Sequence, residues 1–229
     1  FQGRVDEAIL AYKQISELAS DDSDLLVRGL ALMGAGRAAK EAVLDQNSSY
    51  YRDGLNYFAH ANEIFTSINA EKPQADLYLQ VASSAVNAGD SLTSTQYFQK
   101  TIDLSMRKEF YPTLALAHSR LAISILSKSK IEESMSFINK AAEYLKKATN
   151  AGYSRAQLLI DKGTIELARQ DLPSAFDTLN QAMGWFQADH NGRHFELYRA
   201  RISGLLFMTT KLTGQDKDSA QHFMHYQQL

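Results

Sequence analysis

The chain has 229 residues, of which 45% are apolar and 22% are charged, and it contains no cysteine. This composition excludes wholesale disorder and a collagen-like fibre, and the lack of cysteine excludes disulfides and thiolate metal sites. Lysine and arginine total 24 against 26 acidic residues, so the basic excess typical of nucleic-acid binders is missing. No apolar run approaches the roughly 18 residues of a membrane span. We therefore expect a cytoplasmic protein without a membrane span, and no nucleic acid bound by this domain.

Helical periodicity runs along the chain, and convincing strand signals are missing. From Val5 to Leu18 and again from Ile131 to Leu145, apolar residues recur at spacings of three and four. Asn191-Gly192 is a turn dipeptide, but helical periodicity flanks it on both sides. The pattern predicts an all-α protein of about 11 helices, in chain order 4–19, 22–47, 50–69, 74–88, 91–107, 113–127, 130–148, 154–168, 172–188, 193–213 and 216–228.

Prolines and polar residues mark several of the predicted helix starts. Each proline stands where a helical pattern begins, and its missing N–H costs nothing in a first turn. Asp22 or Ser23 is the expected N-cap of the helix over 22–47, and Ser154 that of the helix over 154–168. The three prolines are Pro73, Pro112 and Pro173.

A repeat of about 40 residues underlies this pattern. Six small anchor residues are separated by 46, 40, 40, 41 and 44 positions, and each is followed four positions later by a large apolar residue. Five positions before the anchors, three of the six residues are glycine: Gly3, Gly89 and Gly214. The anchors are Ala8, Gly54, Ser94, Ser134, Ala175 and Ser219, and the large residues are Tyr12, Phe58, Phe98, Ile138, Leu179 and Phe223.

These columns have a physical interpretation. A glycine between two periodic stretches indicates a tight helix–helix turn. A small residue lets two helices approach closely, and a large one fills the space on the neighbouring helix. Small residues also stand 12 positions before four of the last five anchors: Ala42, Ala82, Ala122 and Gly163. The sequence thus predicts repeated antiparallel helix pairs, whose members we call first-type and second-type helices, in a single solenoid domain over 1–229.

The columns resemble the pattern of the tetratricopeptide repeat (TPR) superfamily. One repeat matches it at Ala82, Gly89, Ser94, Phe98 and Thr101, and another at Gly163, Ala175, Leu179 and Ala182. The resemblance implies a right-handed superhelical solenoid of antiparallel helix pairs. The period exceeds the common 34 residues, and in this the chain is similar to long-helix repeat domains of bacterial regulators.

The first residues suggest an excerpt of a larger protein, because the chain starts at the turn of a repeat and lacks that repeat's first helix. Phe1-Gln2-Gly3 matches the tail of a common protease-cleavage linker. Gly3 also falls in the glycine column, as a native turn residue would. Both origins stay open.

No pattern of catalytic, cofactor-binding or metal-binding residues stands out. His190 and His194 have a metal-like spacing, but Asn191-Gly192 interrupts the helix between them, and His222 and His225 have no acidic ligand nearby in sequence. The glycines of Gly34-Ala35-Gly36 sit inside a helical stretch rather than after a strand, which argues against a phosphate loop. We expect a protein that is not an enzyme and needs no cofactor or metal.

The remaining candidate site is a surface. In the family the first-type helices line a concave groove, and few groove positions here carry the lysine, arginine and asparagine of a carboxylate clamp. We expect a non-catalytic scaffold that binds a protein or peptide in this groove as the interaction or regulatory module of a larger protein. The alternative is a small-ligand or signalling-peptide sensor of a bacterial transcriptional or signalling regulator. The resemblance assigns to the groove Asp76, Leu79, Gln80, Ser83, Asn87, Ser119, Arg120, Ile123, Gln157, Ile160, Asp161 and Thr164.

Overall fold

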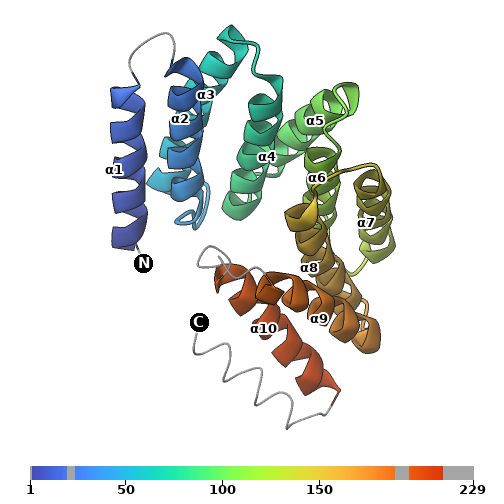
Figure 1. Cartoon of the computed structure of the whole chain (residues 1–229). Coiled ribbons are helices and arrows are strands. Elements are labelled where there is room, and N and C mark those ends of the chain that lie inside the picture. The colour runs from blue at the N-terminus through green and yellow to red at the C-terminus, as the bar shows by residue number, and fades with distance from the viewer. Residues whose placement is uncertain (1, 20–23, 189–195, 214–229) are drawn as a thin grey trace. The chain divides into compact units, whose positions relative to one another are not determined.

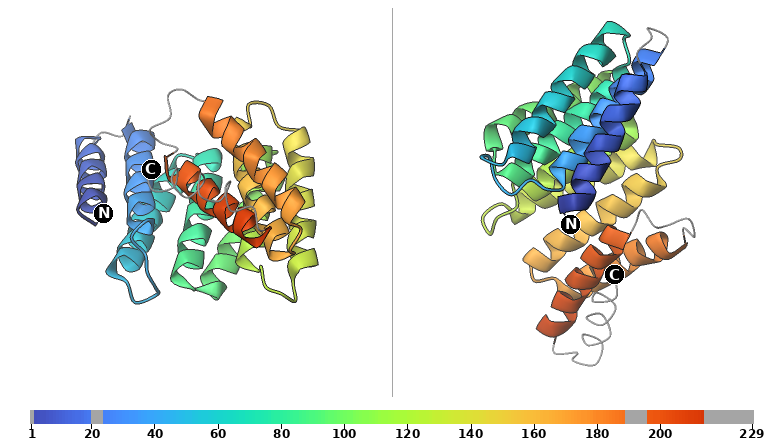
Figure 2. Two further views of the ribbon diagram at one scale, coloured as in Figure 1. Left: turned by 90° about the horizontal axis from the view of Figure 1, so that it is seen from below. Right: turned by 90° about the vertical axis from the view of Figure 1, so that its left-hand side faces the viewer.

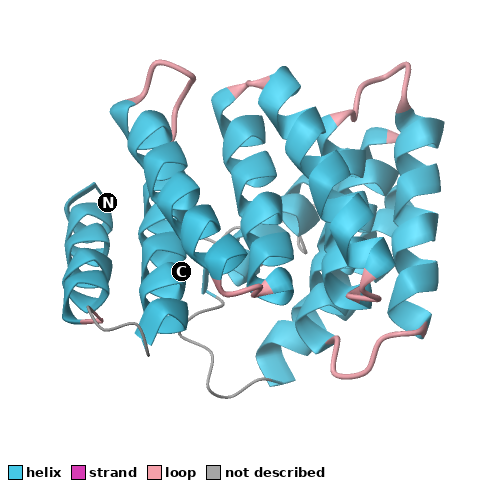
Figure 3. Cartoon of the chain, turned by 90° about the horizontal axis from the view of Figure 1, so that it is seen from above, coloured by secondary structure: helices cyan, strands magenta, loops and turns pink. Residues whose placement is uncertain are grey.

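The computed structural model describes residues 2–19, 24–188 and 196–213. Every regular element in these ranges is an α-helix, and none of these residues lies in a strand (Figure 3). This confirms the predicted all-helical fold; the last predicted helix, 216–228, lies outside the described residues. The helices are α1 Gln2–Leu18, α2 Leu25–Lys40, α3 Ser49–Ser67, α4 Glu71–Ala88, α5 Ser91–Arg107, α6 Tyr111–Ser124, α7 Ile131–Lys146, α8 Gly152–Ala168, α9 Leu172–Ala188 and α10 Glu196–Leu212 (Figure 1).

The chain divides into two compact units, residues 1–117 and residues 118–229, with the boundary inside α6. In the first unit each helix from α1 to α5 packs against the next, and Figure 2 shows α1 running alongside α2. In the second unit α7 packs on α8, α8 on α9 and α9 on α10, and α10 also contacts α8. Consecutive helices therefore pack pairwise within each unit, as in a helical solenoid.

Two of the turns between paired helices, at Gly89 and Gln170, have a left-handed residue in the glycine column of the repeat. Gly89 ends α4 with a φ of 76°, a conformation that glycine adopts without strain. Asp90 then caps α5 by accepting a hydrogen bond from the backbone N–H of Thr93, at 3.0 Å. Gln170, in the glycine column of a later repeat, also has a positive φ, of 65°. Gly3 is an exception, because it lies within α1 rather than at a turn.

Small residues face large ones across two helix pairs, and in the pair α8–α9 the contact is the one that the repeat predicts. A Cβ atom added to Gly163 on α8 would lie 2.7 Å from Cγ of Leu179 on α9. A Cβ atom added to Gly36 on α2 would lie 2.6 Å from a ring carbon of Phe58 on α3. Each close approach needs a residue without a side chain. The large partners sit in the cores of their units, where both are almost fully buried.

The second predicted helix is shorter than its periodicity indicated. It was expected over 22–47, but α2 ends at Lys40 and residues 41–48 form a loop. The polar run at its end explains the difference, because the Asp45 side chain accepts the backbone N–H of Asn47 at 2.8 Å and so favours a turn. Ala42, the small residue that the repeat places on this helix, therefore lies in the loop.

The expected helix starts are confirmed at the prolines and wrong at Ser154. All three prolines lie in a first turn: Pro73 is the third residue of α4, and Pro112 and Pro173 are the second residues of α6 and α9. Ser154 is not a cap, because α8 begins two residues earlier, at Gly152, and the serine is buried inside its first turn. The other predicted caps, at residues 22 and 23, lie outside the described residues.

Candidate functional site

In the first unit, two of the predicted groove side chains are tied to neighbouring helices. Asp76 on α4 accepts hydrogen bonds from Nζ of Lys72 and from Oγ1 of Thr113 on α6, each at 2.7 Å. Gln80, one turn further along, accepts a hydrogen bond at 3.3 Å from Nζ of Lys40 on α2. The polar positions of α4 thus connect it to the first-type helices before and after it.

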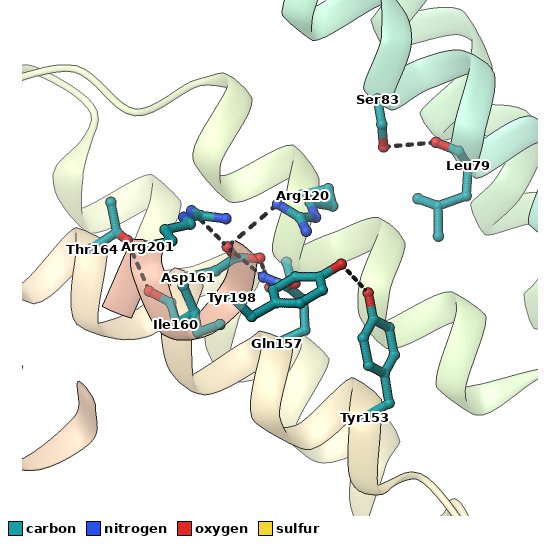
Figure 4. A network of polar contacts seen from close by, with 11 residues as sticks. Leu79, Ser83, Arg120, Tyr153, Gln157, Ile160, Asp161, Thr164, Tyr198 and Arg201 are labelled. Atoms are coloured by element: carbon teal, nitrogen blue, oxygen red, sulfur yellow. Dashed lines mark hydrogen bonds and ion pairs between the residues drawn. The ribbon is translucent and has the colours of Figure 1, made fainter. Parts of the chain in front are cut away.

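The other predicted groove residues of α4 differ in how accessible they are. Leu79 is buried, with 6% of its surface exposed. Ser83 is half-buried, and its hydroxyl donates to the backbone carbonyl of Leu79 at 2.8 Å (Figure 4). Asn87 is exposed near the C-terminal end of the helix. The accessible part of this face is therefore polar.

In the second unit a fully buried carboxylate organises the predicted site. Asp161 on α8 has no exposed surface. Oγ of Ser119, on α6, donates to its Oδ2 at 2.8 Å, and Nε2 of Gln157, one turn earlier on α8, donates to its Oδ1 at 3.1 Å (Figure 4). A buried charge is costly unless it is paired and hydrogen-bonded, and these two neutral donors meet part of that requirement.

Two arginines supply positive charge to the buried carboxylate of Asp161. Arg120 of α6 and Arg201 of α10 approach Oδ1 of Asp161 with guanidinium nitrogens at 3.6 Å and 3.4 Å (Figure 4). Their side chains are 27% and 36% exposed, so each runs from solvent to the buried acid. The group, which we call the Asp161 cluster, therefore consists of Ser119, Arg120, Gln157, Asp161 and Arg201.

Arg201 is the member of the cluster that the sequence reasoning missed. A signal for it exists, because Arg120 stands 41 positions before Asp161 and Arg201 stands 40 positions after it, close to the repeat length. The three residues thus occupy equivalent places on successive first-type helices. Hydroxyls of Tyr153 on α8 and Tyr198 on α10 are also hydrogen-bonded, at 2.6 Å, and so hold these two helices together.

Several of the predicted groove residues are buried among neighbouring helices. Ser119, Gln157, Ile160 and Asp161 have no exposed surface, so they do not line an open face in this structure. Ile160 belongs to a hydrophobic cluster that includes Ile202 and Leu206 of α10. The repeat pattern assigns groove positions to each first-type helix separately. It therefore takes no account of contacts with the next first-type helix. The residues that stay half-buried are Arg120, Ile123 and Thr164.

The second-type helix α7 presents an ordinary polar surface. Four residues along its outer side are all exposed: Glu132, Glu133, Ser136 and Lys140. This face provides control positions for substitutions, because its contacts are exposed ones, such as the Glu132–Arg169 ion pair at 3.4 Å, which contribute little to stability.

The histidine that the structure describes in the second unit sits in an apolar setting. His118 on α6 is buried and stacks with the rings of Phe137 and Tyr144 on α7, at centroid distances of 5.9 and 5.4 Å. Burial, together with the positive charge of Lys140, lowers the pKa of His118 to about 4. The ring is therefore neutral at pH 7, and neither of its nitrogens has a hydrogen-bond partner within the described part of the chain.

Among the described residues, no three His, Asp or Glu side chains are grouped so that they could hold a metal ion. His190, His194, His222 and His225, the histidines weighed as ligands from the sequence, lie outside these residues. Within the same ranges, no helix is both long enough and apolar enough to cross a bilayer.

The fold is similar to that of a known protein. The crystal structure of BtubC (BKLC) from P. vanneervenii matches with a TM-score of 0.71 and 12% sequence identity, over 98% of this chain and 90% of that one. At such low identity the likeness shows the fold alone, an all-helical repeat-like arrangement. No protein-family model and no curated protein matches the chain.

Proposed function

We propose that this chain is a non-catalytic module that binds a protein or peptide partner on its first-type helices, as the interaction or regulatory part of a larger protein. The proposal includes membership of the TPR superfamily and a right-handed superhelix with a concave binding groove. The observation that carries it is the Asp161 cluster, in which a buried acid holds two partly exposed arginines from α6 and α10. Helical solenoids commonly bind partners along such helix faces.

The cluster suits recognition because it orders the arginines before a partner arrives. Each guanidinium has five donors in a rigid plane, and Asp161 restrains each through one nitrogen. A side chain that is already restrained loses less rotamer entropy on binding. Arginine is also one of the residues enriched at binding hot spots.

Apolar and hydroxyl groups complete the proposed surface in the second unit. Ile123, one turn after Arg120 on α6, and Thr164, one turn after Ile160 on α8, are half-buried. Interfaces commonly combine an apolar contact with hydrogen-bonding groups in this way. In the first unit the exposed Asn87 supplies a further donor and acceptor.

A second candidate function is that of a small-ligand or signalling-peptide sensor. It is favoured by a cavity of about 500 Å³ in the first unit, between α3, α4 and α5. This volume is within the range of known small-molecule sites.

The test is a comparison of captured partners. Immobilised parent chain and a variant carrying Asn87→Ala, Arg120→Ala and Ile123→Asp are incubated with the same cell lysate, and bound proteins are quantified by mass spectrometry. A matched control carries Glu132→Ala, Ser136→Ala and Lys140→Ala on the exposed face of α7. Both variants must retain the far-UV circular dichroism spectrum of the parent.

We expect proteins captured by the parent and by the α7 control to be depleted at least about fivefold by the first-type variant, a loss of about 1 kcal/mol in binding. Equal recovery by the parent and the first-type variant would contradict a binding site on these helices. Loss with the α7 control alone would place the site on the second-type helices.

A further inference from the structure

The cavity between α3, α4 and α5 lies away from the Asp161 cluster in the chain and is built entirely within the first unit. Its volume is about 500 Å³. It lies between two second-type helices, α3 and α5, with the first-type helix α4 beneath them, so it shares none of the predicted groove residues. Its chemistry can therefore be considered independently of the proposed groove.

The floor of the cavity is apolar. Phe58 of α3 and Leu77 and Val81 of α4 line it, and each has 3% or less of its surface exposed. These three side chains belong to the hydrophobic core of the first unit. An occupant gains stability by placing apolar surface on this floor, because that surface is removed from water.

The rim of the cavity is polar and carries a negative charge. Asn56, Asn62 and Glu63 line it from α3, and Thr93 and Tyr97 line it from α5. Glu63 is the one charged residue among the lining side chains, and it is exposed. An anionic occupant would face this carboxylate with no lining cation to offset it.

The positive charge of Lys100, on α5, lies over two tyrosine rings. Nζ of Lys100 on α5 lies 4.4 Å from the centroid of the Tyr97 ring and 5.8 Å from that of Tyr78. The ammonium group of Lys100 thus covers one face of the Tyr97 ring. A second cation in the cavity would be directed away from Lys100 and toward Glu63.

We propose that this cavity binds an amphipathic cation: an apolar body that rests on Phe58, Leu77 and Val81, with one amine or guanidinium that pairs with Glu63. Asn62 and Thr93 border the same space and orient the cationic group by hydrogen bonding. A free organic amine and a basic side chain next to an apolar one on a partner chain share this chemistry.

Three probes of similar shape test the charge preference: 2-phenylethylamine, 2-phenylethanol and phenylacetate. Each is titrated into the ¹⁵N-labelled chain, and binding is followed by the chemical shifts of Asn62, Thr93 and Tyr97. We expect millimolar dissociation constants, with the amine at least threefold tighter than the alcohol and the carboxylate weakest. Equal binding of amine and alcohol, or no binding of any probe, would overturn the proposal.

Three variants locate the effect. Glu63→Gln should remove the preference for the amine and leave the alcohol unchanged, whereas Glu17→Gln, on the exposed side of α1, should change neither. Ala59→Trp, at an exposed position of the lining, should weaken both the amine and the alcohol by filling the space. A preference for the amine that survives Glu63→Gln would contradict the pairing.

A further arm separates the two sources of the cation. The capped dipeptide acetyl-Phe-Lys-amide presents an aromatic ring and an amine on a peptide backbone. Tighter binding of this peptide than of 2-phenylethylamine would assign the cavity to a partner chain, and weaker binding would assign it to a free amine. In both results the Glu63→Gln variant must reduce the affinity, or the proposal fails.

Discussion

Replacing Gly163 by alanine should destabilise the second unit, although alanine is the better helix former. A Cβ at this position would lie 2.7 and 2.8 Å from Cγ and Cδ2 of Leu179, whose side chain is fully buried. Removing a glycine from a helix interior gains about 1 kcal/mol. Overpacking a close-packed core costs about 1–3 kcal/mol. The net expectation is a loss of up to about 2 kcal/mol.

Gly184 provides the matched control for this substitution. It lies inside α9 and is exposed, and a Cβ added there would meet nothing within 4 Å. Gly184→Ala should therefore show the helix-propensity gain alone, about 1 kcal/mol. Because this gain is common to both variants, the difference between them isolates the close approach of α8 and α9, about 1–3 kcal/mol.

Urea unfolding measures this difference directly. Trp185, the single tryptophan of the chain, lies on α9, so its fluorescence reports the unfolding of the second unit. The midpoint should fall for Gly163→Ala and rise for Gly184→Ala, with unchanged slopes. Equal stabilisation by both substitutions would refute the small-against-large packing of this helix pair.

Substitutions at four other buried residues give further predictions. Asp161→Ala should lower the free energy of unfolding by about 1.5–3 kcal/mol, because it removes charge-assisted hydrogen bonds, whereas Glu143→Ala at an exposed ion pair should change it by less than about 1 kcal/mol; urea titrations compare the two. The folded pKa of His118, about 4, is below the unfolded value near 6.5, so the unfolded state binds more protons and stability falls as the pH drops from 6.5 to 4. By pH 4 this loss is about 3 kcal/mol, and His118→Phe should remove it from the stability–pH profile. Phe98→Ala should cost about 3–5 kcal/mol through lost burial and a cavity, and Ala122→Leu about 1–3 kcal/mol through overpacking; thermal melts at the parent value would contradict both.

The repeat predicted much of the helix pairing, and its failure in one repeat has a local cause. The spacing of 16 residues that joins Gly163 to Leu179 also joins Ala42 to Phe58, but Ala42 lies in a loop and not on a helix. An eight-residue loop replaces the tight turn after α2, so Gly36 meets Phe58 instead. Sequence spacing predicts a contact only where the connection between the helices has its usual length.

The candidate site was less predictable, because burial depends on a third helix. Gln157, Ile160 and Asp161 carry no sequence feature that separates them from exposed groove positions. Their burial depends on neighbouring helices: Ile160 packs in a cluster with residues of α9 and α10, and Asp161 lies against residues of α6 and α10 that are about 40 positions away. A buried acid in such packing needs hydrogen-bond donors from several helices. Comparing the spacing between Arg201 and Asp161 with the repeat length would have identified Arg201 as one of these donors.

Amide hydrogen exchange of the chain, free and bound to a partner captured by the parent, tests the proposed function most directly. The account predicts added protection in peptides from α6 and α8 that contain Arg120, Ile123 and Thr164, and unchanged exchange in α7 and α9. Protection confined to α7 and α9, with α6 and α8 unchanged, would contradict a binding site on the first-type helices.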